Sequence, residues 1–219
     1  MYFLAHWFVK ITGWIPQLLI WRTKIHYEDK KVQSRKIKGK AILMSNHHNL
    51  LDFAVLMFVF WGRTMRCLMA ELLYKKNIFM TVFIKALGGI KVNRDAHDFS
   101  FLNKTDEILG KGGVVEIFPE SRIPNPGEEK PLEFKPSVAY MALRSGAPII
   151  PIYNNGVYFR KERLRVIIGK PIDVQEWYDD TLSEKENLDI ICKRLREKVV
   201  ELKDELDRQV NGKKEEKAK

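Results

Sequence analysis

The sequence has few cysteines and no uninterrupted apolar run of about 20 residues, the length that a membrane-spanning helix requires. Its two cysteines, Cys67 and Cys192, lie far apart and outside any paired motif, which argues against a disulfide framework and against a zinc site. We expect two buried thiols in a reducing compartment, on the cytoplasmic side. The sequence also lacks a G-x-S-x-G segment, so a serine-hydrolase mechanism would have no nucleophile.

What is present is a basic chain with an ordinary apolar content. Its 219 residues, 45% of them apolar, predict one domain with a buried core. The net charge of +10 favours anionic partners such as nucleic acid, lipid headgroups or phosphorylated metabolites. The sequence contains no recognisable nucleic-acid-binding motif, so nucleic acid is not an expected partner.

The first 40 residues differ from the rest of the chain. Residues 1–21 are apolar and aromatic, are interrupted by Lys10, Gly13 and Pro16, and are followed by a run of lysines and arginines. Aromatic side chains followed by cations are typical of a segment that lies in one membrane leaflet. A spanning helix and a core helix of a soluble domain are the alternatives. We therefore predict a membrane-associating segment (1–40), an α/β domain (41–210) and a disordered tail (211–219).

Short apolar runs alternate with stretches of helical spacing in the predicted domain. The expected strands are residues 41–45, 66–70, 113–118, 148–153 and 164–168. The expected helices are residues 52–61, 99–109 and 137–145, followed by a last helix that begins at a capping box formed by Ser183 and Glu186. This alternation predicts an α/β fold, with a mostly parallel sheet flanked by helices and ligands at the carboxyl ends of the strands.

The segment SNHHNLLD, residues 45–52, contains the candidate catalytic pair. A carboxylate of Asp52 that accepts one ring N–H of His47 leaves the other ring nitrogen able to take a proton from a hydroxyl. Asp52 lies in the first turn of an expected helix, where the helix dipole favours a carboxylate. The same residues also fit an ordinary turn, and His48 is either a competing base or a loop residue that shapes the site.

Two further segments carry charged residues that suit an anionic substrate. Gly89, Lys91 and Arg94 lie in LGGIKVNRD, where glycine permits close backbone approach and arginine suits phosphate. An ordinary surface turn is the alternative. Glu120 and Arg122 follow an expected strand in EIFPESR, where Glu120 can position an acceptor hydroxyl and Arg122 can share a phosphate with Arg94. A third segment, APIIPI (147–152), lines an acyl path or forms a core strand.

Taken in order, these four segments resemble the motifs of the glycerolipid acyltransferase superfamily, and most of all its bacterial 1-acyl-glycerol-3-phosphate acyltransferases. The family's His-x4-Asp is matched by His47 and Asp52, and its Gly-rich segment ending in Arg by GGIKVNRD with Arg94. Its Phe-Pro-Glu block is matched by residues 118–120 and its proline-flanked strand by APIIPI. This chain reads Phe-Pro-Glu-Ser-Arg where the family has Phe-Pro-Glu-Gly-Thr-Arg, one residue longer.

The resemblance implies an enzyme that moves a fatty acyl group from acyl-CoA or acyl-carrier protein to the free hydroxyl of 1-acyl-glycerol-3-phosphate, giving phosphatidic acid. It implies that His47 is the general base, that Asp52 orients it and that Arg94 and Arg122 hold the acceptor phosphate. It implies no metal and no cofactor beyond the thioester co-substrate. It also implies an amino-terminal element that docks on the membrane, so we expect peripheral or monotopic attachment at the cytoplasmic face. The alternatives are acylation of glycerol-3-phosphate or another lysolipid, and a non-catalytic protein that binds anionic membranes.

Overall fold

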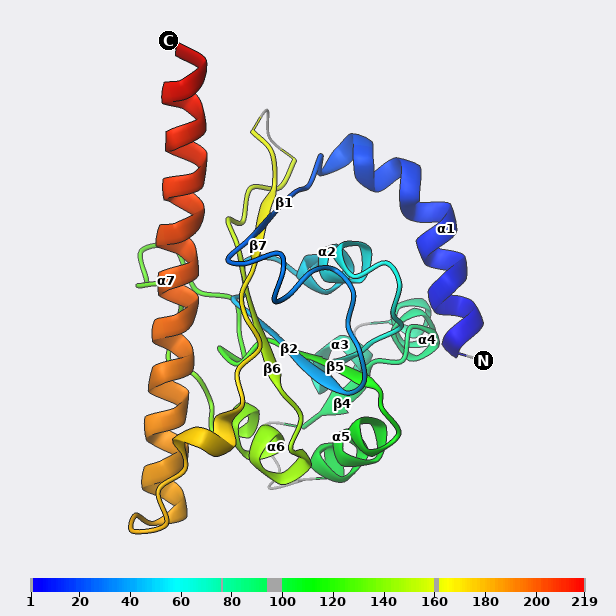
Figure 1. The fold of residues 1–219 in the computed structure, drawn as a ribbon. Coiled ribbons are helices and arrows are strands. Elements are labelled where there is room, and N and C mark those ends of the chain that lie inside the picture. The colour runs from blue at the N-terminus through cyan, green and yellow to red at the C-terminus, as the bar shows by residue number, and fades with distance from the viewer. Residues whose placement is uncertain (1, 76, 94–99, 160–161, 219) are drawn as a thin grey trace.

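A seven-stranded sheet forms the centre of the protein (Figure 1). The computed structural model describes residues 2–75, 77–93, 100–159 and 162–218. The strands are β1 (Lys24–Tyr27), β2 (Ala41–Ser45), β3 (Arg66–Ala70), β4 (Ile90–Val92), β5 (Val114–Ile117), β6 (Ile149–Asn154) and β7 (Arg165–Ile168). Their order across the sheet is β1-β7-β6-β2-β5-β3-β4. Neighbouring strands are parallel except β6 and β7, so the predicted mostly parallel sheet is confirmed.

Helices cover both faces of this sheet. They are α1 (Tyr2–Ile20), α2 (Asp52–Val59), α3 (Glu71–Lys75), α4 (Ile78–Ala86), α5 (Ser100–Gly110), α6 (Ser137–Ser145), the 3-10 helix η1 (Val174–Trp177) and α7 (Glu184–Ala218). Helix α2 lies on one face with α1 beyond it, whereas α6 and α7 pack on the other face together with α5 (Figure 1). Strand β2 lies at the centre and all five of its residues are buried, as expected for a parallel strand that is covered on both faces.

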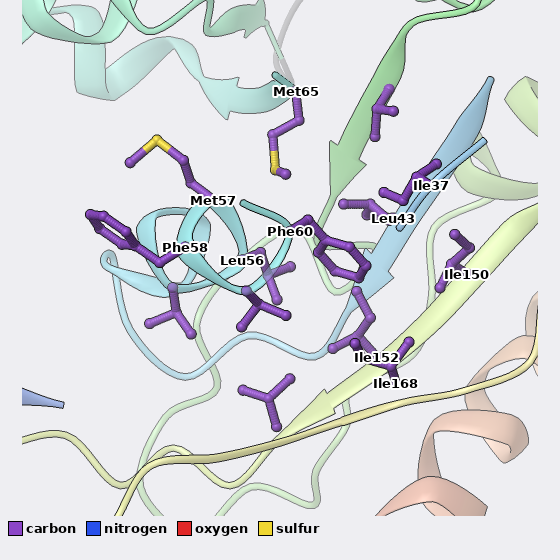
Figure 2. Packing of buried hydrophobic residues seen from close by; sticks show 14 of the residues in the cluster. Ile37, Leu43, Leu56, Met57, Phe58, Phe60, Met65, Ile150, Ile152 and Ile168 are labelled. Atoms are coloured by element: carbon purple, nitrogen blue, oxygen red, sulfur yellow. The ribbon is translucent and has the colours of Figure 1, made fainter. Parts of the chain in front are cut away.

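Alternate residues of the central strands face the two helical layers. Leu43, Ile150 and Ile152 point toward Leu56 and Phe60 on the α2 side (Figure 2). Their neighbours along the strands form a second buried cluster with α5, α6 and α7. Helix α2 is apolar nearly all round, which is typical of a helix buried in a core. Burial of each of these large side chains contributes about 1.5–3 kcal/mol, and it fixes the start of α2 against the end of β2.

Helix α1 is attached to the domain through its polar side chains. His6, Lys10 and Gln17 are its buried residues. The buried Nζ of Lys10 donates to the carbonyl oxygens of Phe60, Trp61 and Arg63, at 3.1, 2.9 and 2.6 Å, just beyond the carboxyl end of α2. A cation is favourable there because the carbonyl groups at the end of a helix carry partial negative charge.

The opposite side of α1 exposes large apolar side chains. We call these residues the α1 apolar face: Phe3, Leu4, Phe8, Ile11, Ile15, Leu18, Leu19 and Ile20. Helix α4, which contacts α1, exposes Ile78, Phe79, Val82 and Phe83. Within the described ranges, no helix is both long enough and apolar enough to cross a bilayer.

Two segments differ from the division predicted from the sequence. Strand β1 is paired with β7 and belongs to the sheet, although it lies before the predicted domain boundary at residue 41. Its sequence, KIHY, offers only four residues and lies inside a basic run, which hides the strand pattern. Helix α7 continues to Ala218, so residues 211–218 are helical where a disordered tail was predicted. Lysine, glutamate and alanine favour helix, and a single glycine costs only about 1 kcal/mol.

Candidate active site

The loop between β2 and α2 wraps around the carboxylate of Asp52. Nδ1 of His47 lies 2.7 Å from Oδ2 of Asp52. The same oxygen accepts the backbone N–H groups of His48 at 2.7 Å and Asn49 at 2.8 Å. Asp52 is 1% exposed and begins α2, where the helix dipole stabilises its negative charge. The contact between His47 and Asp52 that the sequence predicts is therefore present.

Two contacts hold the imidazole of His47. Because the Asp52 carboxylate accepts from Nδ1, the ring carries its proton on Nδ1 and leaves a lone pair on Nε2. The ring stacks on Phe118 with a centroid distance of 4.5 Å and an angle of 20°. The side chain is 16% exposed. A ring held in this way has little freedom to rotate.

Glu120 lies beside the same loop, in contact with the protein backbone. Its Oε1 accepts the N–H of His47 and its Oε2 accepts the N–H of Leu132, both at 2.8 Å. Glu120 is 3% exposed, and burial raises the pKa of its carboxyl group. The structure thus brings Glu120 to His47, as a support for the loop on which His47 lies.

Arg122 is paired with a carboxylate of a neighbouring turn. Its two terminal nitrogens donate to Oε2 and Oε1 of Glu128, at 2.6 and 2.7 Å. This bidentate pair, with help from Asn125, lowers the pKa of Glu128 to about 2. About half of the Arg122 side chain is exposed. The pair with Glu128 uses only two of the five N–H groups of the guanidinium.

The glycine-rich segment lies at the β4 edge of the sheet. Nζ of Lys91 pairs with Oε1 of Glu71 at 2.9 Å, and about half of the Lys91 side chain is exposed. A Cβ atom on Gly89 would lie 2.5 Å from Ile84 and 2.7 Å from the Tyr74 hydroxyl, so glycine is needed there for internal packing. Arg94 lies outside the residues that the structure describes. Gly89 precedes β4 and Lys91 lies within it, whereas His47 follows the carboxyl end of β2, which runs in the same direction.

The segment APIIPI forms most of β6, between β2 and β7. Ile149, Ile150 and Ile152 are at most 2% exposed. The structure therefore supports the core-strand interpretation of this segment. An apolar cavity of about 220 Å³ lies elsewhere, between α1, α2 and α4. It is lined by Val9, Gly13, Pro16, Gln17, Ile20, Trp21, Phe53, Ala54, Met57, Phe58, Phe83 and Leu87.

Three residues near the site were not anticipated from the sequence. The side chain of Asn46 donates to the backbone oxygen of Asn154 at 2.9 Å and accepts its N–H at 2.8 Å. The hydroxyl of Tyr158 donates to Oδ1 of Asp52. Asn154 and Tyr158 lie more than 100 residues from their partners. No local pattern marks such contacts, because they depend on β6 lying beside β2 in the sheet.

Comparisons with known proteins agree with this arrangement. A family model described as "Acyltransferase" matches residues 23–155. Human 1-acyl-sn-glycerol-3-phosphate acyltransferase beta is 21% identical over 169 residues, which are 76% of this chain and 60% of the human protein. The chain thus spans less than two thirds of that relative. The crystal structure of the 1-acyl-sn-glycerophosphate (LPA) acyltransferase PlsC from Thermotoga maritima has a similar fold, with a TM-score of 0.64 at 20% identity over 90% of this chain and 79% of that one.

Proposed function

Because the chain belongs to the acyltransferase family, we propose that it transfers a fatty acyl group from acyl-CoA or acyl-carrier protein to the free hydroxyl of 1-acyl-glycerol-3-phosphate. The observation that carries this proposal is the His47–Asp52 pair at the carboxyl end of β2, where Nδ1 is bound to the carboxylate and Nε2 keeps its lone pair. That arrangement suits a base that removes a proton from an alcohol.

In the proposed reaction, Nε2 of His47 takes the proton of the acceptor hydroxyl as its oxygen attacks the thioester carbonyl carbon. Asp52 stabilises the resulting imidazolium. The tetrahedral intermediate then expels the thiolate as the C–S bond breaks, and the imidazolium returns the proton to sulfur. The products are phosphatidic acid and a free thiol, and His47 is restored to its starting state. No covalent intermediate with the enzyme is required.

Cationic side chains at the β4 edge and after β5 would bind the acceptor phosphate in this proposal. Arg94, Lys91 and Arg122 are the candidates, since guanidinium and ammonium groups pair with phosphate. Lys91 and Arg122 are paired with Glu71 and Glu128, and a doubly charged phosphate is a stronger partner than either carboxylate. Gly89 supports this segment by allowing α4 to pack closely. Glu120 contributes by holding the His47 loop.

The apolar surfaces fit a lipid substrate. The cavity between α1, α2 and α4 has apolar walls that can receive part of an acyl chain, and Phe53 in its wall follows Asp52 directly. The α1 apolar face would lie in one leaflet of the membrane, with the basic residues after α1 near anionic headgroups. Attachment at the cytoplasmic face is part of the same proposal.

A panel of donors and acceptors tests this function. The purified full chain is given labelled acyl-CoA or acyl-carrier protein with 1-acyl-glycerol-3-phosphate, glycerol-3-phosphate or lysophosphatidylcholine. We expect labelled phosphatidic acid to form fastest. A clear preference for another acceptor would reassign the substrate, and no acyl transfer to any acceptor would favour the non-catalytic membrane-binding alternative.

A further inference from the structure

Tyr158 lies in the loop between β6 and β7 and reaches the carboxylate that orients His47. Its hydroxyl donates to Oδ1 of Asp52, whereas Oδ2 accepts from Nδ1 of His47. The two oxygens of Asp52 therefore have separate partners on opposite sides of the carboxylate. With Oδ1 held by Tyr158, the carboxylate cannot turn about its axis without breaking a hydrogen bond to a charged group.

The loop that carries Tyr158 is joined to the His47 loop at two earlier points. Asn46 and Asn154 exchange two hydrogen bonds between the ends of β2 and β6. Gly156 has a φ of 65°, and a Cβ atom there would lie 2.6 Å from the His48 ring. Only glycine allows the two loops to approach so closely. The contact between Tyr158 and Asp52 is thus one of several contacts that hold the two loops together.

Burial keeps the Tyr158 hydroxyl protonated and its ring in place, so the hydroxyl can donate a hydrogen bond to Asp52. Burial, with a further contribution from the Asp52 charge, raises the pKa of its hydroxyl far above the usual value, so the group stays protonated at any working pH. The residue is 9% exposed, and its ring packs edge-on against Trp21 at 6.5 Å. The ring has an apolar packing role that is separate from the hydroxyl, so the two can be tested separately.

We propose that Tyr158 is a positioning residue that fixes Asp52 in the orientation that holds His47. It also weakens the hydrogen bond between Asp52 and the imidazolium of His47. This inference rests on the proposed general-base role of His47. Donation from Tyr158 draws negative charge toward Oδ1, so Oδ2 holds the protonated ring less tightly and the proton can pass to the leaving thiolate. Without the hydroxyl, the carboxylate would hold the imidazolium more strongly and would be freer to rotate.

The test is the substitution Tyr158→Phe in the full chain, which removes the hydroxyl and keeps the ring. We expect kcat to fall roughly tenfold, because a hydrogen bond to a charged group is lost, while KM for donor and acceptor changes less than about twofold. The acid limb of the pH profile of kcat/KM should move to higher pH. The matched control is Tyr153→Phe, a partly buried tyrosine on β6 that packs with α7, for which we expect neither effect.

Two further variants separate positioning from a general structural effect. In an Asp52→Asn background, Tyr158→Phe should cause almost no additional loss, because the two residues act as one unit. Replacing Tyr158 with 3-fluorotyrosine, whose hydroxyl is a stronger donor, should move the acid limb of the kcat/KM profile to lower pH. This variant also provides the test if Tyr158→Phe fails to fold. Unchanged profiles, or additive losses with Asp52→Asn, would overturn the role of Tyr158. A His47→Ala variant that keeps its turnover would instead overturn the proposed function itself.

Discussion

At the scale of single residues, the site depends on buried carboxylates whose oxygens are all used. The carboxylate of Asp52 accepts hydrogen bonds from the ring of His47, from two backbone N–H groups and from the Tyr158 hydroxyl. Hydrogen bonds to a charged group contribute about 1.5–3 kcal/mol each, so this one side chain fixes both the loop and the imidazole. Glu120 gives the loop a second support through the N–H of His47.

The substitution Glu120→Gln distinguishes support of the loop from contact with the acceptor. Glutamine keeps one acceptor oxygen and sets an NH2 group against the other backbone N–H, either that of His47 or that of Leu132. We expect kcat to fall by about tenfold with little change in KM for the acceptor, as measured by steady-state kinetics. A rise in acceptor KM at constant kcat would show that Glu120 binds the acceptor instead. Glu129→Gln, at an exposed position, is the control.

The buried side chain of His6 should make the protein less stable at acid pH. Burial, with a contribution from the nearby Lys10 charge, lowers the pKa of His6 to about 4 from 6.5. The unfolded chain therefore binds more protons than the folded protein between these values, so the free energy of unfolding falls as the pH falls through this window. The free energy of unfolding, measured with urea in detergent, should fall between pH 6.5 and 4 by about 3 kcal/mol more in the wild type than in His6→Leu. A difference that does not depend on pH would mean that His6 becomes charged in the folded protein without cost.

At the scale of elements, α1 has the opposite of the usual amphipathic orientation. Surface helices of globular proteins bury the apolar stripe and expose the polar one. Here the polar residues His6, Lys10 and Gln17 face the domain and the α1 apolar face points outward. Lys10 secures this orientation by capping the end of α2, the helix that begins at Asp52. The helix whose apolar face points outward is thereby attached to the element that carries the candidate site.

Charges placed on the α1 apolar face should detach the protein from lipid. In the double variant Phe8→Glu/Ile15→Glu both side chains are exposed, so the fold should survive. Each apolar side chain that leaves the membrane forfeits about 1.5–3 kcal/mol, so co-sedimentation with vesicles should fall at least tenfold. Ile190→Glu, on α7 across the sheet, is the matched control and should bind like wild type. Equal binding by all three proteins would show that α1 does not face the membrane.

The sequence predicted those elements whose apolar pattern is long and local. The strand Arg66–Ala70 and the helix Ser137–Ser145 have the predicted bounds, and the capping box at Ser183 and Glu186 is present. Strand β1 was missed because it lies inside a basic run, and β4 because three residues are too few for a pattern. Helices α3 and α4 were also missed, since their apolar residues are mostly exposed and follow no core-facing stripe.

The site was predictable as far as it lies in one short segment. The spacing allowed His47 to fold back toward Asp52, and the family resemblance favoured this pair over an ordinary turn; the structure contains the contact. The partners Asn154 and Tyr158 could not be found in this way, since only the position of β6 beside β2 brings them near. The bidentate pair of Arg122 with Glu128 could not be predicted from the sequence either, because it depends on the conformation of the loop between the two residues.

At the scale of the whole molecule, the net charge of +10 should make membrane binding depend on lipid charge and on salt. The screening length falls from about 10 Å at 0.1 M salt to about 3 Å at 1 M salt. We therefore expect binding to vesicles with anionic lipid to weaken several-fold over this range. Binding to neutral vesicles, which depends on apolar contact, should change little. Identical salt dependence for both kinds of vesicle would exclude an electrostatic contribution.

The proposed chemistry depends on one imidazole, that of His47. Its most direct test is the rate at which His47→Ala transfers a labelled acyl group to 1-acyl-glycerol-3-phosphate in mixed micelles. Circular dichroism would verify the fold, and His26→Asn on β1 would serve as the control. The account predicts a fall of about 10²–10⁴-fold in kcat with the fold intact, the range that general-base catalysis provides. A folded His47→Ala protein with turnover within about threefold of wild type would contradict it.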